Sequence, residues 1–462
     1  MAESSMRKAG DIIKKDRISE LPRNVQETIL CFLPIEEAVR TSILSKNWRH
    51  CWTTMPHLIF DGGFYERMVD KLGYHSCTEL MAYRCVSVIN KTILLHRGPV
   101  LKFSLSIPGS ECDAQIFHDY IDQWIPVLSS KGMKELMLED LRLQEDTSYH
   151  FSSLDLTYLR LLSVWFPYKP KFGRFAYLTN LELVDATSHF GQDVFDCPVL
   201  EKLTLILCPG LYHSNFRAPN LSCLRQIYRE INSEIPYVGL DNLKDYSFML
   251  LQPGPLLAKT SNVVKYLGGL HKIEKFSIAR EFVQYLADGG CPNRLSTLLC
   301  YLKTLYVSDI NFTHLPEVSC LLCMIRSAPN LCKLYLLARY CDNCSEKDCY
   351  CEKDLEYYQI EDSEDCTTTC HLEVVTFSYF KGLKAELELV KFILAHSPLL
   401  KTMYIHRSES IKSDVALTMT EEILQYPRAS TIAQIRHLKR LVEKKCVEID
   451  DFDTESWYGY FE

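Results

Sequence analysis

The sequence predicts an α/β protein in which a short helical module precedes a long series of strand-forming repeats. Apolar residues recur at helical spacing over residues 18–52. From residue 133 onward, a six-residue pattern with apolar residues at positions one, four and six recurs, at first every 21–23 residues, and an earlier copy stands at residue 100. The spacing of apolar residues in the first segment is that of an α-helix. In the repeats, positions four and six are two residues apart and so lie on the same face of a β-strand.

The helical module is expected to occupy residues 17–60, after a polar, basic stretch at residues 1–16 that is expected to be a flexible tail. Pro22 suits the first helical position, and Pro34 ends this helix because a residue before proline disfavours the helical conformation. The apolar stripe of the first helix consists of Val25, Ile29, Leu30 and Leu33.

Two further helices are expected in the module. The second begins with Glu36 and Glu37, which the helix dipole favours in a first turn. The third is short and carries Trp48 and Trp52, four residues apart. Three helices of this size cannot bury two tryptophans and a row of aliphatic side chains by themselves, so the module is expected to pack against something else.

The segment "ISELPRNVQETILCFLPIEEAVRTSILSKNWRHCW" resembles the F-box, and its ending looks like the plant form. The resemblance implies that the module docks on a Skp-type adaptor, which bridges to a cullin scaffold. The residues that the resemblance and their apolar placement assign to docking are Leu21, Pro22, Val25, Ile29, Leu33, Pro34, Leu44 and Trp48. The alternative is a helical cap whose apolar faces close onto the repeats. If an adaptor covers the excess apolar surface, deletion of residues 17–60 should abolish adaptor binding and leave a soluble fragment that contains the repeats.

The repeats begin with segments such as "MKELML" at residue 133 and "LEKLTL" at residue 200. A period of about 20–29 residues built on L-x-x-L-x-L is the leucine-rich repeat signature. Each unit supplies one short strand, and units stack because one alone cannot bury its apolar face. An irregular solenoid is therefore expected over residues 100–364. Four units start with a proline, which cannot donate to a sheet and so suits the residue before a strand: Pro198, Pro219, Pro329 and Pro398.

The C-terminal part is expected to form strand, helix and strand, followed by a short helix that Pro427 ends. Residues 365–440 resemble the FBD domain, which follows F-box and leucine-rich repeats in plant proteins; the matching features include Gly382, Glu386 and the "SPLLKTMYI" stretch. The role of this domain in the family is not established, so the resemblance adds no mechanism. Residues 441–462 are acidic and aromatic and are expected to be disordered.

Composition excludes several classes of protein. The formal charge of -8 argues against a nucleic-acid surface, which needs a basic stripe. No apolar run approaches the roughly 20 residues of a membrane span. The start of the chain has no apolar core of a signal peptide, so the 20 cysteines are expected to be reduced thiols in the cytoplasm or nucleus.

One group of cysteines has partial metal-site spacing, within an insertion at residues 341–371. Its members are Cys341, Cys344, Cys349, Cys351, Cys366, Cys370 and His371. Cys341 and Cys344 have the spacing of half a zinc site, but Cys349 and Cys351 are too close together for the other half. We therefore expect a solvated loop and no metal.

No phosphate loop, nucleophile elbow or HExxH pattern is present, so a non-catalytic protein without a cofactor is expected. The first functional hypothesis is the substrate receptor of a Skp-cullin-F-box ubiquitin ligase, whose repeats present an unknown protein target. The second is a leucine-rich interaction scaffold without a ligase role. The third is a hormone-type receptor, which would need a cluster of Lys and Arg for an inositol phosphate inside the solenoid, and the sequence shows no such set.

Overall fold

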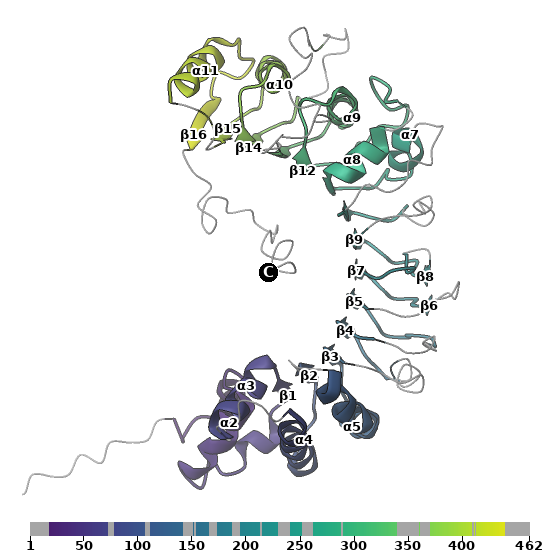
Figure 1. Ribbon diagram of the computed structural model, residues 1–462, viewed down its shortest axis with the longest axis vertical. Coiled ribbons are helices and arrows are strands. Elements are labelled where there is room, and N and C mark those ends of the chain that lie inside the picture. The colour runs from purple at the N-terminus through teal and green to yellow at the C-terminus, as the bar shows by residue number, and fades with distance from the viewer. Residues whose placement is uncertain are drawn as a thin grey trace, which may run out of the picture. The chain divides into compact units, whose positions relative to one another are not determined.

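The computed structural model describes residues 18–72, 78–106, 111–141, 151, 154–165, 173–186, 195–212, 215–229, 241–251, 262–287, 290–339, 360, 370–408, 411 and 413–438. The chain divides into two compact units, residues 1–218 and 219–462. Each unit contains parallel strands that follow one another in chain order (Figure 1). The prediction of a mixed α/β protein is confirmed.

The first unit begins with the helical module. It contains helices α1 (Arg23–Leu30) and α2 (Ile35–Arg40) and the 3-10 helices η1 (Thr41–Ile43) and η2 (Cys51–Thr54). Pro22 and Pro34 directly precede α1 and α2, as expected. The expected third α-helix does not form, because residues 46–50 are turns that lead into η2. The buried indole N–H of Trp48 donates to the Ser19 hydroxyl at 2.9 Å, and this tertiary contact holds the turn.

The sheet of the first unit is parallel. Its strands are β1 (His57–Phe60), β2 (Lys102–Ser106), β3 (Glu135–Glu139), β4 (Tyr158–Leu162), β5 (Asn180–Val184) and β7 (Lys202–Ile206). Helices α3 (Gly62–Leu72) and α4 (Thr78–Leu95) join β1 to β2, and α5 (Glu111–Ser130) joins β2 to β3. Two short strands, β6 (Phe195–Asp196) and β8 (Phe216–Arg217), form a separate parallel pair.

Strand β1 fuses the helical module to the repeats. The Thr53 carbonyl accepts from the Arg97 amide at 2.7 Å, and the Pro56 carbonyl accepts from the Leu101 amide at 2.7 Å. A Cβ atom on Gly98 would lie 2.9 Å from the Thr54 Cα, so this close approach requires glycine. The end of the helical module is therefore hydrogen-bonded to the residues that lead into the sheet.

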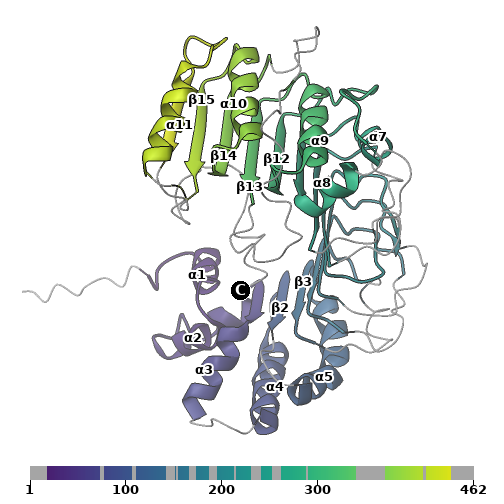
Figure 2. The same cartoon turned by 45° about the horizontal axis from the view of Figure 1, so that its top comes forward.

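The second unit has a parallel sheet with helices on one face (Figure 2). Its strands are β9 (Cys223–Tyr228), β10 (Asp245–Leu250), β11 (Lys275–Ala279), β12 (Thr304–Ile310), β13 (Lys333–Ala338), β14 (Val374–Phe380), β15 (Thr402–Arg407) and β16 (Gln434–Leu438). Its helices are α7 (Asn262–Leu267), α8 (Arg280–Ala287), α9 (Leu315–Arg326), α10 (Lys384–His396) and α11 (Ser413–Gln425). The second unit thus repeats one arrangement, in which each strand is hydrogen-bonded to its neighbours in chain order.

The six-residue repeats coincide with strands. In the repeat at residue 200, for example, Leu203 and Leu205 lie in β7 and are at most 1% exposed, whereas Leu200 precedes the strand and is also buried. Gln226, the one polar residue at such a position, is 1% exposed. Its amide is satisfied by two tyrosines, since its Nε2 donates to the Tyr228 hydroxyl at 2.7 Å and its Oε1 accepts from the Tyr246 hydroxyl at 3.3 Å.

Several strands end in a residue with left-handed backbone conformation. In the described part of the chain, these non-glycine residues with positive φ are Asp140, Ser163, Asp185, Leu207, Asp309 and Tyr379. Their amides extend the ladder beyond the strands, since Asp140 donates to Leu162 O at 3.0 Å and Ser163 donates to Val184 O at 2.8 Å. This turn directs the next residue, such as Leu141, back into the core.

The C-terminal part has the expected order of strand β14, helix α10, strand β15 and helix α11, with β16 in addition. The loop before α10 is held by Glu386, which is fully buried and accepts from the Leu383 amide at 2.8 Å and the Lys381 amide at 3.1 Å. Gly382 in this loop has a φ of +77°, and a Cβ there would lie 2.7 Å from the Met419 sulfur. Both residues are therefore required by the local backbone.

Replacing Glu386 with alanine is expected to destabilise the second unit by about 2–4 kcal/mol, because two amides lose a buried carboxylate acceptor. Glu388→Ala is the matched control on the same helix, since the half-buried Glu388 pairs with two exposed lysines, Lys384 at 3.1 Å and Lys391 at 3.9 Å, and accepts from no backbone amide among the described residues. Such pairs contribute about 0–1 kcal/mol. Denaturant unfolding of both variants checks this, and equal midpoints would contradict the role of Glu386.

Candidate functional site

The candidate site is the outer surface of the helical module, formed by α1, the turn that follows it and the residues after α2. The inner face of α1 is closed by Gln26 and Leu30, which are 4% and 0% exposed. The Gln26 amide donates to Ser19 O at 3.1 Å and its carbonyl oxygen accepts from the Cys51 thiol at 3.2 Å. These contacts fix the rotation of α1 and therefore determine which of its residues face solvent.

The end of the module that faces η2 is held by polar contacts. Arg23 lies 3.2 Å from the Glu27 carboxylate and donates to the His50 carbonyl at 2.6 Å. The Thr54 hydroxyl donates to the same Glu27 carboxylate at 2.5 Å. On the other side, Arg67 of α3 pairs with Glu36 of α2 at 2.5 Å. The helices that carry the outer surface are thus anchored to their neighbours.

The outer surface is apolar. Val25 and Ile29 lie four residues apart on α1 and are each 37% exposed, and Leu33 is 39% exposed. After α2, Ile43 is 87% exposed and Leu44 is 70% exposed. A row of exposed aliphatic side chains on a small helical module is typical of a surface that another protein covers.

The predicted docking residues fall into three groups in the structure. Pro22, Val25, Ile29, Leu33 and Leu44 are exposed, and Leu21 and Pro34 are half-buried. Trp48 is 5% exposed and bonded to Ser19, so in this structure it supports the surface from below.

Sequence reasoning missed the two most exposed apolar side chains of the module. Phe32 is 84% exposed and Ile43 is 87% exposed. Ile43 belongs to the same apolar pattern as Leu44, so the pattern carried a signal for it. Phe32 lies beyond the last residue of α1, where helical spacing no longer predicts the direction of a side chain.

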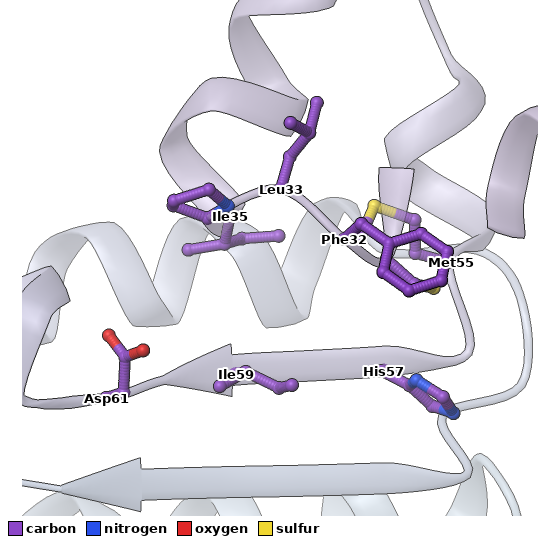
Figure 3. A pocket seen from close by; sticks show the side chains of 9 residues that line it. Phe32, Leu33, Ile35, Met55, His57, Ile59 and Asp61 are labelled. Carbon is purple, nitrogen blue, oxygen red and sulfur yellow. The ribbon is translucent and has the colours of Figure 1, made fainter. Parts of the chain in front are cut away.

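A pocket of about 210 Å³ lies between the turn after α1 and strand β1. Figure 3 shows Phe32 and Met55 at one end, next to His57, with Ile59 and Asp61 farther along the strand. The pocket is bounded on one side by the turn Cys31–Ile35 and on the other by β1, whose Leu58 and Phe60 face the core instead. An apolar side chain of a partner that covers the outer surface can enter here.

The predicted metal cluster lies mostly outside the described residues, which include only Cys370 and His371. His371 Nδ1 lies 3.1 Å from the Pro329 carbonyl oxygen. Among the residues that the structure describes, no three His, Cys, Asp or Glu side chains gather closely enough to hold a metal ion. Burial raises the pKa of Cys197 and Cys208 to about 12, so these two behave as small apolar core residues, as expected.

No helix in the described part of the chain is both long enough and apolar enough to cross a membrane.

Comparison with known families gives three matches along the chain. Residues 18–60 match the F-box domain, and residues 369–405 match FBD. Residues 121–336 match the leucine-rich repeats of "FBD-associated F-box protein At5g56370".

Two similar plant proteins align with most of this chain. The chain is 31% identical over 439 residues to "F-box/FBD/LRR-repeat protein At1g13570" of Arabidopsis thaliana, covering 92% of this chain and 99% of that protein. It is 26% identical over 464 residues to "F-box protein At3g59000" of the same plant, covering 89% of this chain and 90% of that protein. Since the first similarity spans nearly the whole length of both proteins, the chain belongs to the plant family of F-box/FBD/LRR-repeat proteins.

Proposed function

We propose that this protein is a substrate receptor of a Skp-cullin-F-box ubiquitin ligase. The observation that carries the proposal is the exposed apolar row of Val25, Ile29, Phe32 and Leu33 within the segment that matches the F-box domain. F-box modules dock on a Skp-type adaptor that bridges to a cullin. The apolar surface of α1 and its following turn would be buried in that contact, with Ile43 and Leu44 beside it.

The repeats would hold the protein target. We infer that the parallel strands, which follow one another in chain order, are the units of a leucine-rich solenoid. The contribution of such a receptor is proximity, since holding a target lysine near a ubiquitin-charged enzyme raises its effective concentration. The receptor itself then needs no catalytic residue or cofactor. The cytoplasm and nucleus are the compartments that suit this role.

The test is adaptor binding by the full chain. Val25→Asp combined with Ile29→Asp places two charges in the apolar row without touching the buried face of α1. Affinity for a purified Skp-type adaptor should fall at least a hundredfold, because each lost apolar anchor costs about 1–3 kcal/mol and each buried charge adds to this. The melting temperature should change little, since both side chains are exposed.

Ser87→Asp is the matched control, because Ser87 is an exposed polar residue on α4, outside the proposed docking surface. It should leave adaptor affinity within about twofold, since surface charges distant from an interface contribute little. A wild-type chain that does not bind the adaptor would reject the ligase role and leave the interaction scaffold as the interpretation.

A further inference from the structure

The face of strands β12–β16 opposite the helices differs from the rest of the sheet in its charge and in its aromatic content. Five residues lie side by side across these strands in direct register, and we call them the tyrosine row: Tyr306, Tyr335, Thr376, Tyr404 and Arg436. The rings of Tyr306 and Tyr335 are 6.3 Å apart, and the Arg436 guanidinium lies 6.0 Å from the Tyr404 ring. Tyr306 and Tyr404 are half-buried and Arg436 is exposed, whereas Tyr335 and Thr376 between them are 8% and 5% exposed. The row therefore offers two partly exposed tyrosine rings and a cation.

The charges on this face are positive only. The charged side chains on the described strands β12–β16, on the same face as the tyrosine row, are Lys333 and Arg436, and both are exposed. Arg436 donates to the Gln434 side chain at 3.0 Å, and in the described residues neither cation has a carboxylate partner. This excess of positive charge contrasts with the formal charge of -8 for the whole chain.

On the corresponding face of the first unit, Lys102 and Arg160 are paired with carboxylates, whereas Lys202 on β7 is exposed. Lys102 on β2 lies 3.5 Å from Glu135 on β3, and Arg160 on β4 lies 3.7 Å from Glu182 on β5. Each of these cations has its counter-ion on the next strand. An anionic partner would gain little binding free energy from cations that are already paired. It would form a new ion pair with Lys333 or Arg436.

Buried polar groups in the tyrosine row and beside it on the same face lack hydrogen-bond partners among the described residues. His406 is 2% exposed, and neither of its ring nitrogens has a hydrogen-bond partner among the described residues. The hydroxyls of Ser308 and Thr376 are buried on the same face and are likewise unpartnered within that part of the chain. Burial lowers the pKa of His406, so its ring is neutral at pH 7 and adds one donor and one acceptor. Unsatisfied groups of this kind are rare in folded proteins, and these three can accept or donate hydrogen bonds to a bound segment.

We propose that this face of β12–β16 is the target-binding surface of the receptor and that it takes an extended, acidic and aromatic segment of the target protein. The inference rests on the proposed function in that it calls the bound protein a target of the ligase. Binding of the segment to this face does not itself depend on adaptor docking. Carboxylates of the segment would pair with Lys333 and Arg436, and its aromatic side chains would pack on the half-buried Tyr306 and Tyr404.

The strand spacing sets the spacing of the carboxylates. Lys333 lies on β13 and Arg436 on β16, three strand steps apart. With about 4.8 Å per step, the two cations are separated by about 15 Å across the sheet, which about four or five extended residues span at about 3.3 Å each. The segment should therefore carry two carboxylates four or five positions apart, with aromatic residues between them.

The experiment uses the full-length chain and a fluorescein-labelled peptide, Gly-Ser-Glu-Tyr-Ser-Phe-Glu-Ser-Gly, whose glutamates are four positions apart. Fluorescence anisotropy should show binding at least tenfold tighter than for the same peptide with glutamine in place of glutamate. The difference should shrink as salt is raised, because added ions screen exposed charges. Equal binding of the two peptides, or binding of neither, would overturn the proposal.

Variants locate the site on the sheet. Arg436→Gln and Lys333→Gln should each weaken binding of the glutamate peptide about fivefold, and Tyr404→Ala should weaken both peptides, on the scale of single interface contacts. Lys102→Gln, which removes a paired cation on the corresponding face of the first unit, is the matched control and should have no effect. An unchanged affinity in Arg436→Gln would place the peptide elsewhere and overturn the assignment.

The acidic stretch at residues 448–462 is a competing occupant with the same chemistry. A full-length variant with Asp450→Asn, Asp451→Asn, Asp453→Asn and Glu455→Gln separates the two cases. Tenfold tighter peptide binding in this variant would assign the face to the chain's own tail and overturn binding of a target segment. Unchanged binding supports the target segment.

Adaptor affinity, measured on the same preparations, keeps this inference separate from the ligase role. Loss of peptide selectivity with intact adaptor binding would reject only the target surface. Selective peptide binding without adaptor binding would reject only the ligase role.

Discussion

Deleting residues 1–60 is expected to unfold the strands that follow, so that residues 61–462 are recovered mainly as aggregate. The deletion removes β1, whose Leu58 and Phe60 are fully buried and whose backbone pairs with β2. It also exposes Phe103 to solvent, whose ring centroid lies 6.0 Å from that of Phe60 in the intact protein. Losing each such large core side chain costs about 2–5 kcal/mol, and together these losses approach the whole stability of a typical domain, about 5–15 kcal/mol.

The measurement is soluble yield and circular dichroism of the 61–462 fragment beside the full-length Val25→Asp/Ile29→Asp variant. Both lack the proposed docking surface, but only the fragment lacks β1. We expect a cooperative melting transition from the substituted chain alone. A soluble fragment with the same transition would instead support the separable module that the sequence predicts.

Phe32→Asp is expected to reduce adaptor affinity about a hundredfold or more while leaving the fold intact. Phe32 is 84% exposed next to a pocket lined by Leu33, Met55 and His57, so an adaptor that covers this surface buries the ring. Buried aromatic anchors at interface centres cost about 2–4 kcal/mol when truncated, and a charge in their place adds a desolvation penalty. Titration calorimetry against the purified adaptor, with thermal unfolding in parallel, measures both effects.

Ser87→Asp serves as the control for Phe32→Asp as well, since it introduces the same charge at an exposed polar position on α4, outside the proposed docking surface. Its adaptor affinity should stay within about twofold of the wild type, as for an exposed charge outside the interface. If Phe32→Asp also binds normally, the main anchors lie at Ile43 and Leu44 rather than on the turn after α1.

The repeats were the most predictable part of the structure. A strand of five or six residues with buried positions two apart is a local pattern, so Leu203 and Leu205 could be placed on one face from spacing alone. Gln226 occupies the same position and is equally buried, but only the structure shows the two tyrosine hydroxyls that satisfy it. Strands β1 and β16 lack the full repeat pattern and were not predicted.

The candidate site was less predictable because exposure depends on tertiary contacts. Leu30 and Phe32 are two residues apart in one apolar run, yet Leu30 is 0% and Phe32 is 84% exposed. The difference arises from the contacts of Gln26 with Ser19 and Cys51, which orient α1. The tyrosine row was also hidden from the sequence, since its members come from five strands whose register only the folded sheet reveals.

The order of the strands has a consequence for biosynthesis. Within each unit, every strand of the main sheet pairs with the strands just before and after it among those of that sheet, so no strand waits for a distant part of the chain. Folding that needs only sequence neighbours can advance while the ribosome is still adding residues. The apolar row of α1 would then be presented before the FBD segment is translated, so a nascent chain could meet its adaptor before it can hold a target.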